Sequence, residues 1–170
     1  MNIGLEINHS MSVLLNNLDI ALDVVKEGVS VFTKNISNYN KLADNVGREV
    51  KIEADIQLNK LLMKQIKKRS HFNIISEEIS ENLIIENDYN WILDPLDGSF
   101  NFLRGIPAYC ISLALWKGYD PLLGVVYDLR QDDIYYGIIG QNAYKNKNII
   151  NVSKVSEVSE AVLCTGFPVN

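Results

Sequence analysis

Cysteine is scarce in this 170-residue sequence, and the two that occur form no recognised pattern. Cys110 and Cys164 lie far apart, each in an apolar stretch, and neither belongs to a C-x-x-C motif or a Cys/His cluster. This argues against a disulfide framework and against a zinc site, and it favours two buried free thiols. A reducing, cytoplasmic setting is the simplest one for such a chain.

Long hydrophobic runs and a leader pattern are also missing. No apolar run approaches the length that a membrane span requires. Residues 1–10 show no basic segment followed by an apolar core, which a secretory signal would need. Internal repeats and low-complexity tracts are absent as well. We therefore expect no membrane partner.

Positive charge is in deficit, because 16 Lys and Arg face 21 Asp and Glu, for a net charge of −5. This balance argues against a general nucleic-acid or membrane-surface binder, which needs a basic face. The hydrophobic share of 47% and the charged share of 22% are typical of a globular protein. A chain of this length fits one domain and can bury a core.

Two segments of the first third carry apolar residues with helical spacing. We predict a first helix that begins near an N-cap at Ser10, with a bend at Gly28, followed by a polar loop over Asn35–Asn45. Its apolar face consists of Met11, Leu14, Leu15, Leu18, Ala21, Leu22, Val25, Val29 and Phe32. A second helix is predicted from about Glu53 to Arg69, with basic residues in its last turn where the helix dipole favours them.

The rest of the chain alternates short β-prone runs with turn-like segments. The predicted strands are Phe72–Ser76, Tyr89–Leu93, Cys110–Trp116, Leu122–Tyr127, Ile134–Ile139, Ile149–Val152 and Ala161–Thr165. From about residue 110 onward this pattern indicates an antiparallel meander. The sequence therefore predicts an α+β fold, with two long helices packed on an antiparallel sheet and no domain boundary inside the chain.

The segment from Trp91 to Phe102 offers chemistry at a single turn. A strand leads to Asp94, Pro95 forces a turn, and Asp97 and Gly98 follow, after which a short helix can open. Two carboxylates three residues apart can converge on one point, where hard oxygen ligands suit Mg²⁺. The backbone N–H groups of Gly98 and Ser99 would face a phosphate there. Ordinary turn chemistry is the alternative interpretation, and spacing alone leaves both open.

Three further acidic residues could join this turn. Glu77 and Glu78 close a predicted strand, and their adjacent carboxylates could share metal ions with another acidic strand end. Asp55 lies in the first turn of the second helix, where a charge that favours the helix dipole is the simpler explanation. A solvated acidic surface is the corresponding alternative for the glutamates.

In these motifs the chain resembles the inositol monophosphatase-like, Mg²⁺-dependent and Li⁺-sensitive phosphatases. That family has an acidic pair followed by a W-[IV]-[IV]-D-P-[IL]-D-G-[ST]-x-N-F signature. The matching segments, in chain order, are Ser76-Glu77-Glu78, Trp91–Phe102, Ile106-Pro107, Ser112-Leu113, Gly124–Tyr127, Gly140–Tyr144 and Thr165–Pro168. The resemblance implies that residues 1–170 form the N-terminal, metal-binding half of a layered αβαβα sugar-phosphatase fold.

The resemblance also implies a role for each matched residue. Glu77, Asp94 and the carbonyl of Leu96 would bind one Mg²⁺, and Asp94 and Asp97 a second, with two or three ions in all. Asp55 and Ser99 would orient and activate the attacking water. The N–H groups of Gly98 and Ser99 would bind the substrate phosphate. Glu78 would support the site without direct ligation.

The implied reaction is hydrolysis of a small phosphorylated polyol, sugar or nucleotide. Inositol monophosphate is the first candidate, followed by fructose 1,6-bisphosphate and 3′-phosphoadenosine phosphates. A homodimer is implied by family analogy alone. The residues themselves leave open a plain α+β domain whose acidic loops are only solvated, although the ordered motif match argues against it.

One expected element is not found. The family has a later W-D-x-A-A element whose Asp completes the second metal site, but Ile92 and Lys117 follow the two tryptophans here. We therefore expect the C-terminal α/β half to be absent from this chain and the chain alone to show little Mg²⁺-dependent activity. A truncated, non-catalytic domain that binds Mg²⁺ or phosphate is the alternative.

Overall fold

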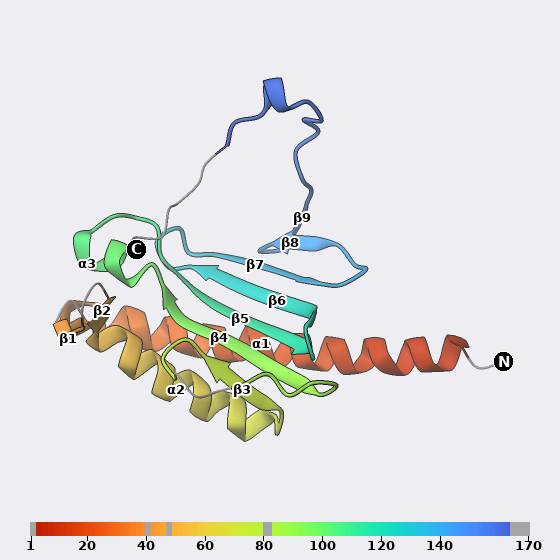
Figure 1. The fold of residues 1–170 in the computed structure, drawn as a ribbon, viewed down its shortest axis with the longest axis horizontal. Coiled ribbons are helices and arrows are strands. Elements are labelled where there is room, and N and C mark those ends of the chain that lie inside the picture. The colour runs from red at the N-terminus through yellow and green to blue at the C-terminus, as the bar shows by residue number, and fades with distance from the viewer. Residues whose placement is uncertain (1–2, 40–41, 47–48, 80–82, 164–170) are drawn as a thin grey trace.

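A mixed sheet with helices on one face makes up the fold in the computed structural model, which describes residues 3–39, 42–46, 49–79 and 83–163 (Figure 1). The helices are α1 (Ile3–Tyr39), α2 (Glu53–Arg69) and α3 (Ser99–Arg104), with a 3₁₀ turn at Val158–Glu160. The strands are β1 (Leu42–Val46), β2 (Glu49–Ile52), β3 (Asn73–Ser76), β4 (Tyr89–Asp97), β5 (Cys110–Lys117), β6 (Asp120–Asp128), β7 (Asp133–Ile138), β8 (Ala143–Lys145) and β9 (Asn148–Ile150).

Seven strands form the main sheet, in the order β3-β4-β5-β6-β7-β8-β9, and β1 and β2 form a separate antiparallel pair. Every neighbouring pair of the main sheet is antiparallel except β3 and β4, which run parallel. The predicted α+β class is confirmed, and with it the predicted meander from β5 to β9, which β4 extends by one antiparallel strand. The parallel pair was not foreseen, and it brings the ends of β3 and β4 to the same edge of the sheet.

The core lies between this sheet and the two long helices. Leu113 of β5 and Val125 of β6 pair across the sheet and are fully buried beneath α1. The apolar face of α2 is buried along its whole length, through Ala54, Leu58, Leu62 and Ile66. Burial of these side chains, each contributing about 1–3 kcal/mol, holds the sheet and the helix layer together.

Gly28 marks a close approach of α1 to α2 and not a bend, because α1 continues through it. A Cβ at this position would lie 2.7 Å from Cδ2 of Leu62 and 3.2 Å from Cδ1 of Ile111. The glycine therefore lets the helix backbone contact the core directly.

The predicted limits of the first helix are wrong at both ends. The helix begins at Ile3, so Ser10 lies inside it and is not its N-cap. It also continues to Tyr39, and β1 follows at Leu42, so Asn35–Asn45 is not one loop. Tyr39 is buried and its ring centroid lies 5.8 Å from that of Phe32, two turns earlier. This packing sustains the helix across residues that are individually poor helix formers.

The other predicted elements agree closely with the structure, with two exceptions. The second helix has the predicted bounds, and strands lie in the predicted runs from Phe72 to Val152. The short strand β8 was not predicted, because three residues carry too little periodicity. Residues 161–163 are not in a strand, and the rest of the predicted strand Ala161–Thr165 lies outside the described residues.

The face of the main sheet that points away from α1 and α2 is here named the open face. It includes a row of small residues paired across four strands: Ala114, Gly124, Gly137 and Ala143. These residues line a shallow cavity of about 320 Å³, and a Cβ added to Gly124 would meet no atom within 4 Å. Within the described residues, no helix is long and apolar enough to cross a membrane.

Candidate metal and phosphate site

The parallel ends of β3 and β4 place two carboxylates side by side. Ser76 pairs with Leu93, and the N–H of Glu77 donates to the carbonyl of Leu93 at 3.2 Å. The next residue on β4 is Asp94, whose carboxyl group, when protonated, can donate a hydrogen bond to the carboxylate of Glu77. Glu77 is exposed and Asp94 half-buried, so the pair lies at the surface of the sheet edge.

An irregularity in β4 carries the third carboxylate. The pairing of β4 with β5 slips between Asp94 and Asp97, because Pro95 has no N–H to donate to the neighbouring strand. The N–H of Leu96 turns back to Oδ1 of Asp94 at 3.1 Å, while the Leu96 side chain is buried. Pairing resumes at Asp97, which lies opposite Cys110 of β5. The predicted turn at Pro95 is therefore wrong, because β4 continues through an irregularity to Asp97, and the turn into the predicted short helix lies at Gly98.

Gly98 ends the strand in a conformation that other residues avoid. Its φ is +80°, and a Cβ would lie 2.5 Å from the carbonyl oxygen of Ala108. The same carbonyl accepts a hydrogen bond from Nδ2 of Asn101 at 2.8 Å, which fixes the loop beside the turn. Helix α3 begins at Ser99, and Phe102 anchors it by packing against Phe32 with ring centroids 5.1 Å apart.

A buried hydrogen bond links α2 to the end of β3. Oγ of Ser76 donates to Oδ1 of Asn59 at 2.8 Å, and both side chains are buried. Asp55 lies one helical turn before Asn59 on the same face of α2 and is also buried. The bond therefore places the end of α2 that carries Asp55 beside the strand end that carries Glu77.

The carboxylates at this edge repel one another. Burial raises the pKa of Asp94 from 3.8 to about 8, and the neighbouring Glu77 and Asp97 add to the rise. The described ion pairs join Arg69 to Glu27 and Lys145 to Asp133, so neither of them neutralises this edge. A partly buried carboxyl group crowded by negative charge favours binding of a proton or a cation.

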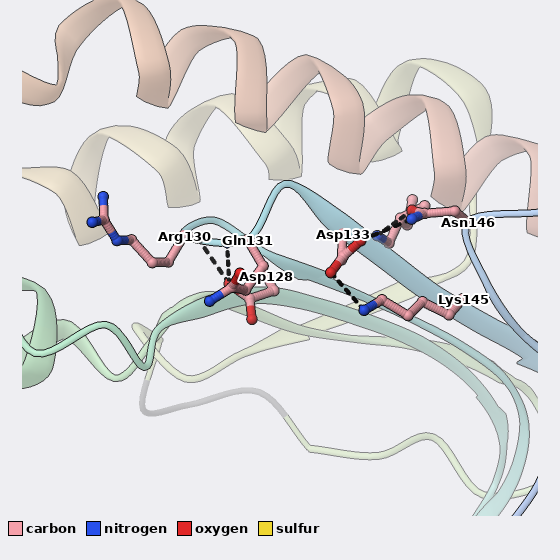
Figure 2. Close-up of polar contacts among 7 residues, drawn as sticks. Asp128, Arg130, Gln131, Asp133, Lys145 and Asn146 are labelled. Carbon is pink, nitrogen blue, oxygen red and sulfur yellow. Dashed lines mark hydrogen bonds and ion pairs between the residues drawn. The ribbon is translucent and has the colours of Figure 1, made fainter.

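A second aspartate shows the opposite environment. Asp133 lies beside Nζ of Lys145 at 2.8 Å and Nδ2 of Asn146 at 2.8 Å (Figure 2). These two hydrogen bonds lower the pKa of Asp133. Asp133 thus already has a cationic partner within the chain, whereas the environment of Asp94 favours one from outside.

A cavity of about 410 Å³ adjoins the turn. It is lined by Asp97, Gly98, Asn101, Cys110, Asp128 and Tyr135, among others. Among the described residues, no group of three or more His, Cys, Asp and Glu side chains is arranged so that it could hold a metal ion. Any ion here would thus need ligands beyond the carboxylates, such as water, backbone carbonyls or phosphate oxygens.

The structure brings together most of the predicted site residues. Glu77, after β3, and Asp94 and Asp97, on β4, lie at the shared end of the two strands, Leu96 lies between the last two, and Gly98 and Ser99 follow directly. Asp55 lies on α2 one turn before Asn59, whose side chain contacts Ser76, and Glu78 is half-buried next to Glu77.

Sequence reasoning missed the supporting contacts of four residues: Asn59, Ser76, Asn101 and Cys110. Ser76 and Asn101 lie within the matched motifs, but no local signal shows these contacts, because each partner lies elsewhere in the sequence. Cys110 is a free thiol, as predicted, but half-buried and not fully buried. Cys164 lies outside the described residues.

Removing the hydroxyl of Ser76 tests the link between α2 and β3. We expect Ser76→Ala to lower the free energy of unfolding by about 1–3 kcal/mol, because Oδ1 of Asn59 loses its buried donor. Urea denaturation measures this value. Ser153→Ala, in the exposed segment after β9, is the control and should change it by less than about 0.5 kcal/mol. Equal effects of both changes would contradict the structural role of the bond.

Comparison with known proteins identifies the family. The model of the inositol monophosphatase family matches residues 11–170, and the chain belongs to that family. Inositol monophosphatase 1 of Solanum lycopersicum is 32% identical over 153 residues, which cover 87% of this chain and 56% of that protein. The fructose-1,6-bisphosphatase/inositol-1-monophosphatase of Thermococcus kodakarensis is 32% identical over 147 residues, which cover 85% of this chain and 57% of that protein.

Solved structures share the fold. A staphylococcal inositol monophosphatase, in an inhibitory complex soaked in 100 mM LiCl, superposes with a TM-score of 0.69 at 26% identity. The match covers 78% of this chain and 51% of that one. The chain thus spans little more than half the length of the relatives that it matches.

Proposed function

We propose that this chain supplies the metal- and phosphate-binding part of a Mg²⁺-dependent phosphomonoesterase. The observation that carries the proposal is the pairing of Glu77 with Asp94 at the parallel ends of β3 and β4, beside the Asp97–Gly98 turn. Family membership supports it, as do relatives that are named phosphatases. Activity, substrate and metal are proposals for the whole protein.

The donor set suits Mg²⁺. Its groups are hard oxygens, and the raised pKa of Asp94 shows that burial and the neighbouring carboxylates disfavour its charged form. Proteins commonly bind Mg²⁺ through one or two carboxylates plus water and substrate phosphate, and not through a complete cage of side chains. The finding that no three such side chains converge among the described residues agrees with that pattern.

Each residue then takes one role. Glu77, Asp94 and the Leu96 carbonyl would hold one ion, and Asp94 with Asp97 would hold a second, with two or three ions in total. When bound, the ions would supply charge neutralisation for the phosphate and a lowered pKa for the attacking water. The position of Asp94 between the other two carboxylates suits a residue shared by both sites.

The remaining residues bind and orient. The N–H groups of Gly98 and Ser99 would donate to the substrate phosphate, and the left-handed turn at Gly98 keeps the backbone open toward the adjoining cavity. Ser99 and Asp55 would hold the attacking water in line with the phosphorus, with Asp55 accepting its proton. Burial of Asp55 at a fixed helix terminus limits the orientations of its carboxylate.

The proposed substrates are small phosphorylated polyols, sugars or nucleotides. Inositol monophosphate stands first, because it is named in both curated relatives, and fructose 1,6-bisphosphate second, because it is named in one. A 3′-phosphoadenosine phosphate is third. The LiCl complex of the staphylococcal relative supports inhibition by Li⁺. A cytoplasmic location and a homodimer complete the proposal, with neither nucleic acid nor membrane as a partner.

A phosphatase panel with and without Mg²⁺ tests this function. The wild-type chain, an Asp94→Asn variant and an Asp19→Asn control on the exposed side of α1 are assayed for phosphate release, and Mg²⁺ binding is followed by calorimetry. If Asp94→Asn abolishes Mg²⁺ binding and Asp19→Asn does not, the result supports the metal site. If phosphate release by the three proteins follows the same order, the result also supports catalysis by this chain. Binding without turnover favours the non-catalytic alternative, and no Mg²⁺ binding by the wild type contradicts the proposal.

A further inference from the structure

We propose that Cys110 is a positioning residue that fixes the carboxylate of Asp97 through an S–H···O hydrogen bond. Sγ of Cys110 donates to Oδ2 of Asp97 at 3.6 Å. The part of this inference that concerns metal binding rests on the proposed function, whereas the bond itself does not.

Strand register brings the thiol between two carboxylates. Cys110 on β5 pairs with Asp97 on β4 and with Asp128 on β6. Residues directly opposite one another in antiparallel strands point to the same face, so the three side chains form one row across the sheet. All three line the 410 Å³ cavity beside Gly98. A thiol in this row is a donor flanked by two acceptors.

The turn after β6 explains why the thiol bonds to Asp97 and not to Asp128. Oδ1 of Asp128 accepts the backbone N–H groups of Arg130 and Gln131, both at 2.9 Å (Figure 2). Asp128 is thus held as the cap of its own turn.

The bond has a consequence for Asp97. This residue is exposed and directly follows the irregular part of β4, so backbone pairing alone does not restrict its side chain. The thiol donates its hydrogen bond to Oδ2 of Asp97, and Oδ1 is not part of this bond. Groups that hydrogen-bond to a metal ligand fix its orientation, and their loss costs about 10- to 100-fold in metal affinity. Because a thiol is a weak hydrogen-bond donor, we expect loss of the Cys110 thiol to weaken metal binding by about 10-fold, the lower of these values.

Infrared spectroscopy tests the bond without any metal. The S–H stretching band that disappears in Cys110→Ala belongs to Cys110, and Cys164→Ser serves as the matched control for the second thiol. We expect this band to shift to higher frequency in Asp97→Asn, because an amide oxygen is a weaker acceptor than a carboxylate. Asp128→Asn should leave the band in place. The assignment is overturned if the band frequency is unchanged in Asp97→Asn, or if it shifts in Asp128→Asn instead.

Metal affinity tests the positioning role. Mn²⁺ binding, followed by electron paramagnetic resonance, is compared for the wild-type chain, Cys110→Ser and Cys110→Ala, with thermal denaturation confirming that each variant is folded. We expect Cys110→Ala to weaken Mn²⁺ binding about 10-fold, and Cys110→Ser, which restores a donor, to stay within about 3-fold of the wild type. Equal affinity of the alanine variant overturns the role. Absence of Mn²⁺ binding by the wild type contradicts the proposed metal site, while the infrared result still decides the bond.

Discussion

Replacing Asp94 with Asn is expected to abolish Mg²⁺ binding and, at the same time, to stabilise the metal-free chain. The two effects share one cause, which is the crowding of Asp94 by burial and by the Glu77 and Asp97 carboxylates. Bound Mg²⁺ would offset this repulsion, and the uncharged amide of the Asp94→Asn variant does not experience it. Loss of a direct ligand should weaken Mg²⁺ binding by about 100-fold or more, beyond the effect of losing an outer partner.

The stability difference depends on pH in a defined direction. The pKa of Asp94 is about 8 in the folded chain against 3.8 ordinarily, so the folded state binds more protons between these values. The contribution of Asp94 to stability is therefore lost as pH rises from about 4 to about 8, and Asp94→Asn has no such contribution. Because Asp94 is not fully buried, we discount the shift for solvent screening and expect Asp94→Asn to gain about 1–3 kcal/mol at pH 8.

Urea denaturation at pH 4 and pH 8, with and without Mg²⁺, measures both effects. At pH 4 the variant and the wild type should be nearly equal, and at pH 8 without Mg²⁺ the variant should be more stable. Saturating Mg²⁺ should stabilise only the wild type, by about 2.7 kcal/mol at 100 times its Kd. Asp19→Asn, the matched control, should follow the wild type throughout. A variant that is less stable at pH 8 without Mg²⁺ would contradict the crowding of Asp94.

Gly98→Ala is expected to lower the free energy of unfolding by about 3 kcal/mol or more. A positive φ costs a non-glycine residue about 1–3 kcal/mol, and here the new Cβ would also lie 2.5 Å from the Ala108 carbonyl oxygen and 3.2 Å from Cα of Tyr109. Both neighbours are backbone atoms, so relief requires movement of the loop that Asn101 holds. We expect phosphate binding to be lost with this geometry.

Gly105→Ala is a matched control for that change. Gly105 also has a positive φ, of +70°, but a Cβ there would meet no atom within 4 Å. It should therefore show only the conformational cost, about 1 kcal/mol. Chemical denaturation of both variants separates the steric contact from the strain. If both variants lose the same free energy of unfolding, the contact between a Cβ at residue 98 and Ala108 does not contribute to the destabilisation.

Local patterns predicted those elements whose cause is local. The bounds of α2 followed from an apolar stripe at helical spacing, with acidic residues at its start and basic ones at its end. The irregular end of β4 and the turn into α3 followed from Pro95 and Gly98, although the turn lies at Gly98 and not at Pro95. In contrast, the end of α1 depends on the packing of Tyr39 against Phe32, which no local window of polar residues reveals.

The same distinction separates the predicted from the unpredicted parts of the site. The carboxylates were found because they lie within a recognised motif. Cys110 and the Asn59–Ser76 bond were not, because their partners lie 13 and 17 residues away, respectively. Their contribution depends on the register of β4 with β5 and on the seating of α2 against β3. Roles of the individual residues remain proposals that the variants above address.

The open face of the main sheet gives the molecule one apolar surface, opposite the side that carries the helices. Its row of small residues leaves an apolar trough, beside which Val126, Ile139 and Ile150 are exposed, while the last turn of α2 carries lysine and arginine. We expect self-association to depend on that face more than on the net charge of −5. Sulfate and phosphate strengthen apolar association, so concentrated phosphate buffers should promote aggregation. Binding measurements are therefore best made in dilute protein at low salt.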